Sequence, residues 1–230
     1  MPDRLGLLKT TLLDYPGRVA STVFTHGCPY RCPYCHNANL VSGPVPDDFV
    51  STDEVLAHLR KRRNVLGGVC ITGGEPLVHH DLADLCRAIR KIGLDVKLDT
   101  NGAFPDRLSE VMAARVIDYV AMDIKTSFSS YSRVGGDGES ALESLRAIQE
   151  SGIAHEFRTT VVPGIVDSDD LGAIADYLRP GDHYVLAQFR PGDTLDPGFA
   201  TAEPYPGDVI RAWRDALCER GIDCAVRGVI

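Results

Sequence analysis

The stretch His26-Gly27-Cys28-Pro29-Tyr30-Arg31-Cys32-Pro33-Tyr34-Cys35-His36-Asn37 places three cysteines in one short loop. Thiolates at the spacing Cys-x3-Cys-x2-Cys can bind three irons of a cubane iron–sulfur cluster, and no fourth cysteine lies close by in the sequence. One iron then lacks a protein ligand and can bind a small molecule directly. The spacing therefore indicates a cluster at which chemistry takes place, rather than a sealed electron carrier.

Other interpretations of this cysteine loop stay open. Cys32-Pro33-Tyr34-Cys35 has the form of a glutaredoxin-type redox pair, although such a pair has no use for Cys28. The same cysteines followed by His36 match the attachment motif of a c-type haem, which normally forms after export. A structural zinc can use the cysteines and His36, although the adjacent Cys35 and His36 make awkward co-ligands. The open iron–sulfur site is the interpretation that we favour.

The composition is that of an ordinary globular chain. It has 230 residues, and the net charge of −8 argues against a groove that binds nucleic acid. We find neither a signal peptide nor a run long enough to span a membrane, so we expect a cytoplasmic protein with reduced thiols. Seven cysteines, an odd number, then favour metal or redox chemistry over a disulfide framework. We interpret Cys70 and Cys86 as core residues and assign no role to Cys218 and Cys224.

Short β-rich runs alternate with helical patterns along the whole chain, which predicts one α/β domain over residues 1–230. The expected strands are Val19–Thr25, Gly68–Thr72, Asp95–Asp99, Ile117–Met122, Glu156–Val162, Tyr184–Ala187 and Asp223–Val226. The expected helices are Thr52–Arg62, Asp81–Ile92, Pro105–Ala114, Ser140–Glu150, Ser168–Leu178 and Gly207–Arg220. About six strand–helix units are too few for a closed eight-stranded barrel. We therefore expect an open, partial (β/α)6 TIM-like barrel.

The distinctive motifs follow the ends of successive strands. The cysteine loop follows the first expected strand, and Gly73-Gly74-Glu75-Pro76 follows the second. Asp99-Thr100-Asn101-Gly102 and Asp123-Ile124-Lys125 close the next two strands. Because the carboxyl ends of barrel strands form the active face, these motifs should surround one cavity.

Together these motifs resemble the radical S-adenosylmethionine (SAM) superfamily. Within it, the chain is similar to the activases of glycyl-radical enzymes, and most of all to the activating protein of anaerobic ribonucleoside-triphosphate reductase. The resemblance runs from about Leu7 to Pro197. Besides the cysteine loop and the glycine turn, it rests on Asp14-Tyr15-Pro16-Gly17, Cys35-His36-Asn37, Asp99-Thr100-Asn101-Gly102, Asp123-Ile124-Lys125 and Val161-Val162-Pro163-Gly164.

The resemblance implies a barrel of the radical SAM type with a [4Fe–4S] cluster on Cys28, Cys32 and Cys35. The amino and carboxylate groups of SAM would bind the open iron. One electron then splits SAM, and a 5′-deoxyadenosyl radical takes a hydrogen atom from a glycine of the partner enzyme. No side chain is expected to act as an acid or base. The expected partners are the glycyl-radical enzyme and a low-potential electron donor such as flavodoxin or ferredoxin, with no nucleic acid and no membrane.

The headgroup of SAM carries both signs, so its site should offer both. Asp123 can accept from the ammonium and Lys125 can pair with the carboxylate, because positions two apart on a strand point the same way. A surface ion pair is the alternative for these two residues. The resemblance assigns a ribose contact to Asn37 and an adenine contact to the backbone of Tyr34. The candidate SAM-binding residues are Tyr34, Asn37, Gly73, Gly74, Glu75, Thr100, Asp123, Lys125, Arg158 and Arg190.

Related pyruvate formate-lyase activases carry a monovalent cation beside SAM. The matching positions here are Asp99, Thr100, Asp123 and the backbone carbonyl of Ala121, and oxygen ligands suit a hard cation. Those activases also have a histidine after the sixth strand, where this chain has Gln188-Phe189-Arg190-Pro191. Arg190 is therefore the candidate substitute. No cysteine-rich insertion lies near Asp47–Val50, so we expect a single cluster.

The sequence leaves two further functions open. One is a radical SAM enzyme that acts on a small molecule, similar to 7-carboxy-7-deazaguanine synthase. The other is a zinc or electron-transfer protein without enzymatic activity. An activase that generates a glycyl radical on anaerobic ribonucleotide reductase is the hypothesis that we favour.

Overall fold

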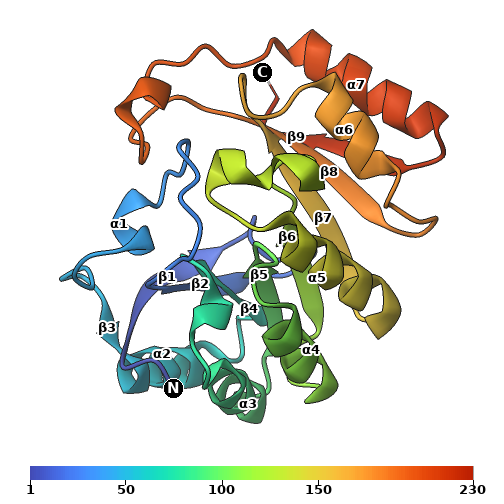
Figure 1. Cartoon of the computed structure of the whole chain (residues 1–230). Helices are drawn as coiled ribbons and strands as arrows, with labels where there is room; N and C mark the ends of the chain where they lie inside the picture. The colour runs from blue at the N-terminus through green and yellow to red at the C-terminus, as the bar shows by residue number, and fades with distance from the viewer. Residues whose placement is uncertain (230) are drawn as a thin grey trace.

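Within residues 1–229, which this computed structural model describes, nine strands form one sheet. The strand order is β3-β1-β2-β4-β5-β6-β7-β8-β9 (Figure 1). The strands are β1 (Arg4–Thr11), β2 (Ala20–Thr25), β3 (Val50–Ser51), β4 (Gly68–Gly73), β5 (Asp95–Thr100), β6 (Tyr119–Asp123), β7 (Ala154–Val161), β8 (His183–Gln188) and β9 (Asp223–Arg227). From β2 to β9 every neighbouring pair is parallel.

Helices connect the parallel strands and lie along the outer side of the sheet (Figure 1). Because β3 and β9 are the two ends of the strand order, the sheet does not close on itself. The expected open, partial TIM-like barrel is therefore confirmed. The helices are α1 (Ala38–Val41), α2 (Thr52–Arg62), α3 (Leu82–Ile92), α4 (Pro105–Ala113), α5 (Gly138–Ser151), α6 (Ser168–Ala175) and α7 (Gly207–Glu219). Over residues 1–229, none of them combines the length and the apolar character that crossing a membrane requires.

Local sequence explains where several helices begin and end. Ser51 and Glu54 form a reciprocal capping box at the start of α2, and Asp167 with Asp170 does the same for α6. Helix α3 ends at Gly93, whose φ of 94° is in the left-handed region that glycine tolerates best. These signals are local, so the sequence predicted most helix ends to within a few residues.

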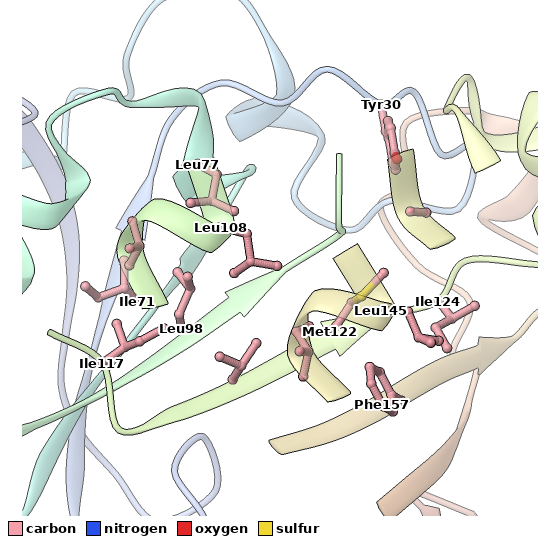
Figure 2. Close-up of a cluster of buried hydrophobic side chains, with 14 of the residues drawn as sticks. Tyr30, Ile71, Leu77, Leu98, Leu108, Ile117, Met122, Ile124, Leu145 and Phe157 are labelled. Carbon is pink, nitrogen blue, oxygen red and sulfur yellow. The ribbon is translucent and has the colours of Figure 1, made fainter. Parts of the chain in front are cut away.

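The two faces of the sheet have different characters. Ile71, Leu98, Met122 and Phe157 are fully buried and pack with the helices, as Figure 2 shows. Successive residues of a strand point to opposite faces of the sheet. In each strand, the residues next to these four therefore point to the concave side, which the helices leave uncovered. These alternate positions include Lys97, Asp99, Asp123 and Arg158. The core therefore covers one face, and the chemistry-bearing side chains gather on the other.

The edge of the sheet before β2 was not predicted. Strand β1 runs antiparallel to β2, with Gly6 opposite Phe24, and β3 pairs with β1 through Leu5 and Val50. A two-residue strand such as β3 forms only because its partner lies beside it. Cys70 and Cys86 are fully buried, as expected, whereas Cys218 is exposed.

Candidate functional site

The carboxyl ends of β2, β4, β5 and β6 surround a cavity of about 140 Å³. Cys28, Cys32 and Cys35 line it, and all three are free thiols. The other predicted site residues that line it are Tyr34, Asn37, Gly73, Gly74, Asp99, Thr100, Asp123 and Lys125. The structure thus brings together residues from four strand ends. A larger cavity of about 740 Å³ between α4 and α5 is lined by none of the residues that the sequence singled out.

The first half of the cysteine loop is held by the short helix α1. The amide of Gly27 donates to the carbonyl of Leu40 at 2.8 Å, and that of Cys28 donates to Val41 at 3.1 Å. Asn37 precedes this helix, and its Nδ2 donates to the carbonyl of Gly73 at 3.2 Å. Helix α1 therefore joins the cysteine loop to the glycine turn after β4.

The second half of the loop is held by residues 191–205, which we call the strap. The strap connects β8 to α7 and reaches across to the side of the molecule that carries α1 (Figure 1). Leu195 donates its amide to the carbonyl of Cys35 at 3.0 Å, and Asp196 donates to Pro33 at 2.8 Å. The ring of Phe199 packs on Tyr34, with 6.5 Å between the ring centroids. The strap was not among the predicted site elements.

The donor set fits an iron–sulfur cluster. Burial raises the pKa of Cys28 to about 11 and also raises that of Cys32, while the charge of Lys125 opposes both shifts. Buried thiols of this kind are costly to ionise alone, and a metal centre supplies the missing positive charge. Cys28, Cys32 and Cys35 face one cavity and form no disulfide. These residues can hold the cluster that the sequence predicted.

The turn after β4 needs glycine at both of its first positions. Gly73 has a φ of 116°, and a Cβ atom there would lie 2.5 Å from the backbone of Thr25. At Gly74 a Cβ atom would stand 2.2 Å from the carbonyl oxygen of Gly27, the residue before Cys28. Glycine lets the two backbones meet at this distance. The turn therefore packs directly against the start of the cysteine loop.

Glu75 is fully buried beneath this turn. Its oxygens accept from the amides of Leu77 (3.0 Å) and Asn101 (2.7 Å) and from Thr100 Oγ1 (2.9 Å). Burial raises the pKa of Glu75 to about 7, and these three hydrogen bonds oppose the shift. The carboxylate thus links the turn after β4 to the turn after β5. Its oxygens are engaged by the protein rather than directed at a headgroup.

Asp123 and Lys125 present both signs of charge at the cavity. Lys125 Nζ lies 2.9 Å from Asp123 Oδ2, and Arg158 Nε donates to the other carboxylate oxygen at 2.7 Å. Burial alone would raise the pKa of Asp123, but Arg158 and Lys125 hold it well below its usual range. The pair therefore stays charged and partly accessible at the mouth of the barrel, which suits a zwitterionic ligand.

The four residues expected to bind a monovalent cation lie on the neighbouring strands β5 and β6. Asp99 is opposite Ala121 in the register, and Ala121 is fully buried. The carboxylate of Asp99 contacts both Lys97 and Arg158, and Asp123 is also bound by Arg158. In this arrangement the guanidinium of Arg158 carries positive charge between the two carboxylates.

Arg190 lies apart from these residues. It is exposed after the end of β8, and its Nη2 atom lies 3.7 Å from where a Cβ at Gly228 would stand. Asn101, by contrast, was not among the candidates. It is buried, lines the cavity and donates from Nδ2 to Cys28 Sγ at 3.5 Å. Its place in the quoted Asp99–Gly102 motif was the one signal that could have pointed to it.

Two of the curated relatives found by comparison with known proteins are similar in length to this chain. A protein of Methanocaldococcus jannaschii named "Putative glycyl-radical enzyme activating enzyme MJ1227" is 31% identical over 207 residues, which cover 84% of this chain and 82% of that protein. The pyruvate formate-lyase 1-activating enzyme of Escherichia coli (strain K12) is 31% identical over 166 residues, with 69% and 67% covered.

A solved structure shares the fold of this chain, and a family model matches its sequence. SuiB of Streptococcus suis, bound to S-adenosylmethionine, superposes with a TM-score of 0.69 at 15% identity. That match covers 89% of this chain and 49% of SuiB, and at such identity it shows the fold alone. The model of the Radical SAM superfamily matches residues 22–178. Because that segment extends from within β2 to just beyond α6, the chain belongs to the radical SAM superfamily and is an enzyme that uses a [4Fe–4S] cluster and SAM.

Proposed function

We propose that this enzyme generates a glycyl radical on a partner protein, and that the partner is an anaerobic ribonucleotide reductase. The curated relatives are named for the activation of glycyl-radical enzymes. The observation that carries the proposal is the single cavity in which three free thiols meet both signs of charge. When bound and reduced, the cluster would supply one electron for cleavage of SAM, and SAM would supply the carbon radical needed to remove a hydrogen atom from glycine.

In this proposal the chain's own residues hold and orient the two cofactors. Cys28, Cys32 and Cys35 would hold the cluster through three of its irons, with the fourth free to bind SAM. Asp123 accepts from the ammonium of SAM, and Lys125 pairs with its carboxylate. These roles agree with the position of all five side chains on the cavity wall.

The remaining SAM contacts are proposed around this core. The backbone of Gly73 and Gly74 lies open to the headgroup, because neither residue has a side chain in the way. Asn37 serves the ribose, and the backbone of Tyr34 serves the adenine. Glu75 acts by fixing the turn, since its oxygens are already bonded to Thr100 and Asn101.

The motifs Asp14-Tyr15-Pro16-Gly17 and Val161-Val162-Pro163-Gly164 support the activase class as a whole. The choice of anaerobic ribonucleotide reductase as partner rests on the overall resemblance of the sequence to its activating protein. We further propose a single domain over residues 1–230, of which residue 230 lies outside the described part of the chain. A cytoplasmic location agrees with seven free thiols. A monovalent cation near Asp99 and Asp123 also remains a proposal, as does electron supply by a flavodoxin or ferredoxin.

The test is anaerobic reconstitution with iron and sulfide, followed by reduction and addition of SAM. We expect 5′-deoxyadenosine and methionine, and a glycyl doublet in electron paramagnetic resonance when anaerobic ribonucleotide reductase is added. Pyruvate formate-lyase is the control client and should give no doublet. SAM cleavage with a doublet only on pyruvate formate-lyase would overturn the choice of partner. Absence of SAM cleavage from iron-loaded protein would overturn the proposal as a whole.

A further inference from the structure

The side-chain amide of Asn101 has one defined orientation. Its Oδ1 accepts from the amide of Ala103 at 3.0 Å, so the oxygen faces its own turn. The Nδ2 group is therefore directed the other way, and it lies 3.5 Å from Cys28 Sγ. Asn101 is only 6% exposed, so water competes little for this donor.

The turn that carries Asn101 is itself anchored. The backbone amide of Asn101 donates to Glu75 Oε2 at 2.7 Å, and Thr100 Oγ1 donates to Oε1 at 2.9 Å. Because Glu75 belongs to the turn that packs on Gly27, the donor is fixed relative to the cysteine loop.

The backbone of Cys28, which carries the accepting sulfur, is also held in place. The amide of Cys28 donates to Val41 at 3.1 Å, and its carbonyl accepts from Arg31 Nη1 at 2.8 Å. Cys28 and Asn101 are therefore positioned by separate sets of hydrogen bonds, one from α1 and one from Glu75. A contact fixed from both sides is a preorganised one.

We propose that Asn101 sets the reduction potential of the cluster by donating a hydrogen bond to its ligand Cys28, an inference that rests on the proposed binding of the cluster by that cysteine. Reduction adds one negative charge, part of which resides on the ligand sulfurs. A donor at the sulfur stabilises the reduced form more than the oxidised form, and so raises the potential. Asn101 thus acts through Cys28 as a positioning residue.

The principal test is the substitution Asn101→Asp. Aspartate keeps an oxygen to accept from Ala103 and puts a second oxygen where the donor was. In a redox titration followed by electron paramagnetic resonance at pH 8.5, without SAM, we expect the equilibrium constant for one-electron reduction to fall at least tenfold, which is about 59 mV. The matched control is Asn39→Asp, which makes the same change on an exposed residue of α1 and should leave the potential unchanged.

A second variant and a second measurement keep the test decisive if Asn101→Asp binds no iron. Asn101→Ser can still accept from Ala103 but is too short to reach Cys28, so its potential should also fall. Electron–nuclear double resonance in H2O and D2O should show an exchangeable proton coupling in the wild type that Asn101→Ser lacks. Unchanged potentials in iron-loaded variants, or the same coupling in both proteins, would overturn this inference. Failure of the proposed function looks different, because the wild type would then lack the cluster or SAM cleavage.

Discussion

Arg158 joins Asp123 to Asp99, and these two carboxylates stand near the ends of neighbouring parallel strands. Its Nε donates to Asp123 at 2.7 Å, and its Nη1 lies 3.3 Å from Asp99 Oδ2. Arg158 itself comes from β7, so one side chain ties three strands together on the concave face. Lys97 adds a further contact to Asp99, and Lys125 a further contact to Asp123. The charged residues of the site are therefore one network.

Removal of Arg158 should destabilise the protein strongly. Arg158→Met leaves the partly buried carboxylates of Asp99 and Asp123 with only Lys97 and Lys125 as partners, and losing a hydrogen bond to a charged group typically costs about 1.5–3 kcal/mol. Arg179→Met is the matched control, because Arg179 is half exposed and lies 3.8 Å from an exposed Glu150. We expect that control to change stability by less than about 1 kcal/mol. Anaerobic thermal unfolding of the iron-loaded proteins measures the stability of both variants. An unfolding midpoint of Arg158→Met equal to that of the wild type would contradict the network.

The three loop cysteines should control iron binding. Replacing Cys28, Cys32 or Cys35 with alanine removes one ligand of the proposed cluster, so iron and sulfide per chain should fall well below the wild-type value. Cys218→Ala removes an exposed thiol and should leave both unchanged. Chemical iron and sulfide determination after anaerobic reconstitution gives the answer. Full loading of a Cys32→Ala protein would exclude Cys32 as a ligand.

Gly74 should not tolerate a methyl group. In Gly74→Ala the new Cβ meets the carbonyl of Gly27 at 2.2 Å, so the start of the cysteine loop must move. Overpacking of this kind typically costs about 1–3 kcal/mol, and the displaced Cys28 should also lower iron retention. Gly172→Ala in helix α6 is the control, because the nearest atom outside that helix, Arg220 Nη1, would lie 3.9 Å from the new Cβ atom. That variant should be neutral or more stable by about 0.5–1 kcal/mol.

His155 should make stability depend on pH. Its hydrogen bond to Asp182 raises the pKa of the imidazole, partly offset by burial. The folded state therefore favours the protonated ring. The stabilisation is fully present below the unfolded value of about 6.5 and is lost as the pH rises through the higher folded value. Thermal unfolding measures this effect. The difference in unfolding midpoint between the wild type and His155→Gln should shrink from pH 6 to pH 8.5. A difference that stays constant would show that packing, not charge, is what His155 contributes.

The sequence predicted the parts of this protein that local patterns determine. The cysteine spacing, the glycine turn and the alternation of strands and helices each lie within short segments, and the open barrel follows from their number. Strands β1 and β3 were missed because they form by pairing with each other and with β2 at the sheet edge. Their own residues carry little β signal without that partner.

The connections of the site could not be predicted, because they join residues far apart in the chain. Glu75 was among the SAM-binding candidates, and the structure adds that its carboxylate accepts from Thr100 and Asn101 at the end of the next strand. The contact of Asn101 with Cys28 spans 73 positions. The spacing of a motif does not predict whether Thr100 or Asn101 will face a cysteine sulfur, because that depends on how the strands twist and pack.

The strap has a consequence for how the protein is made. Two carbonyls of the cysteine loop, at Pro33 and Cys35, receive their hydrogen bonds from Asp196 and Leu195. Synthesis reaches the three cysteines long before residues 195 and 196, so these contacts cannot form until the strap has been made. The finished geometry of the cysteine loop therefore requires the strap, and a chain that stops before residue 195 offers its cysteines without this support.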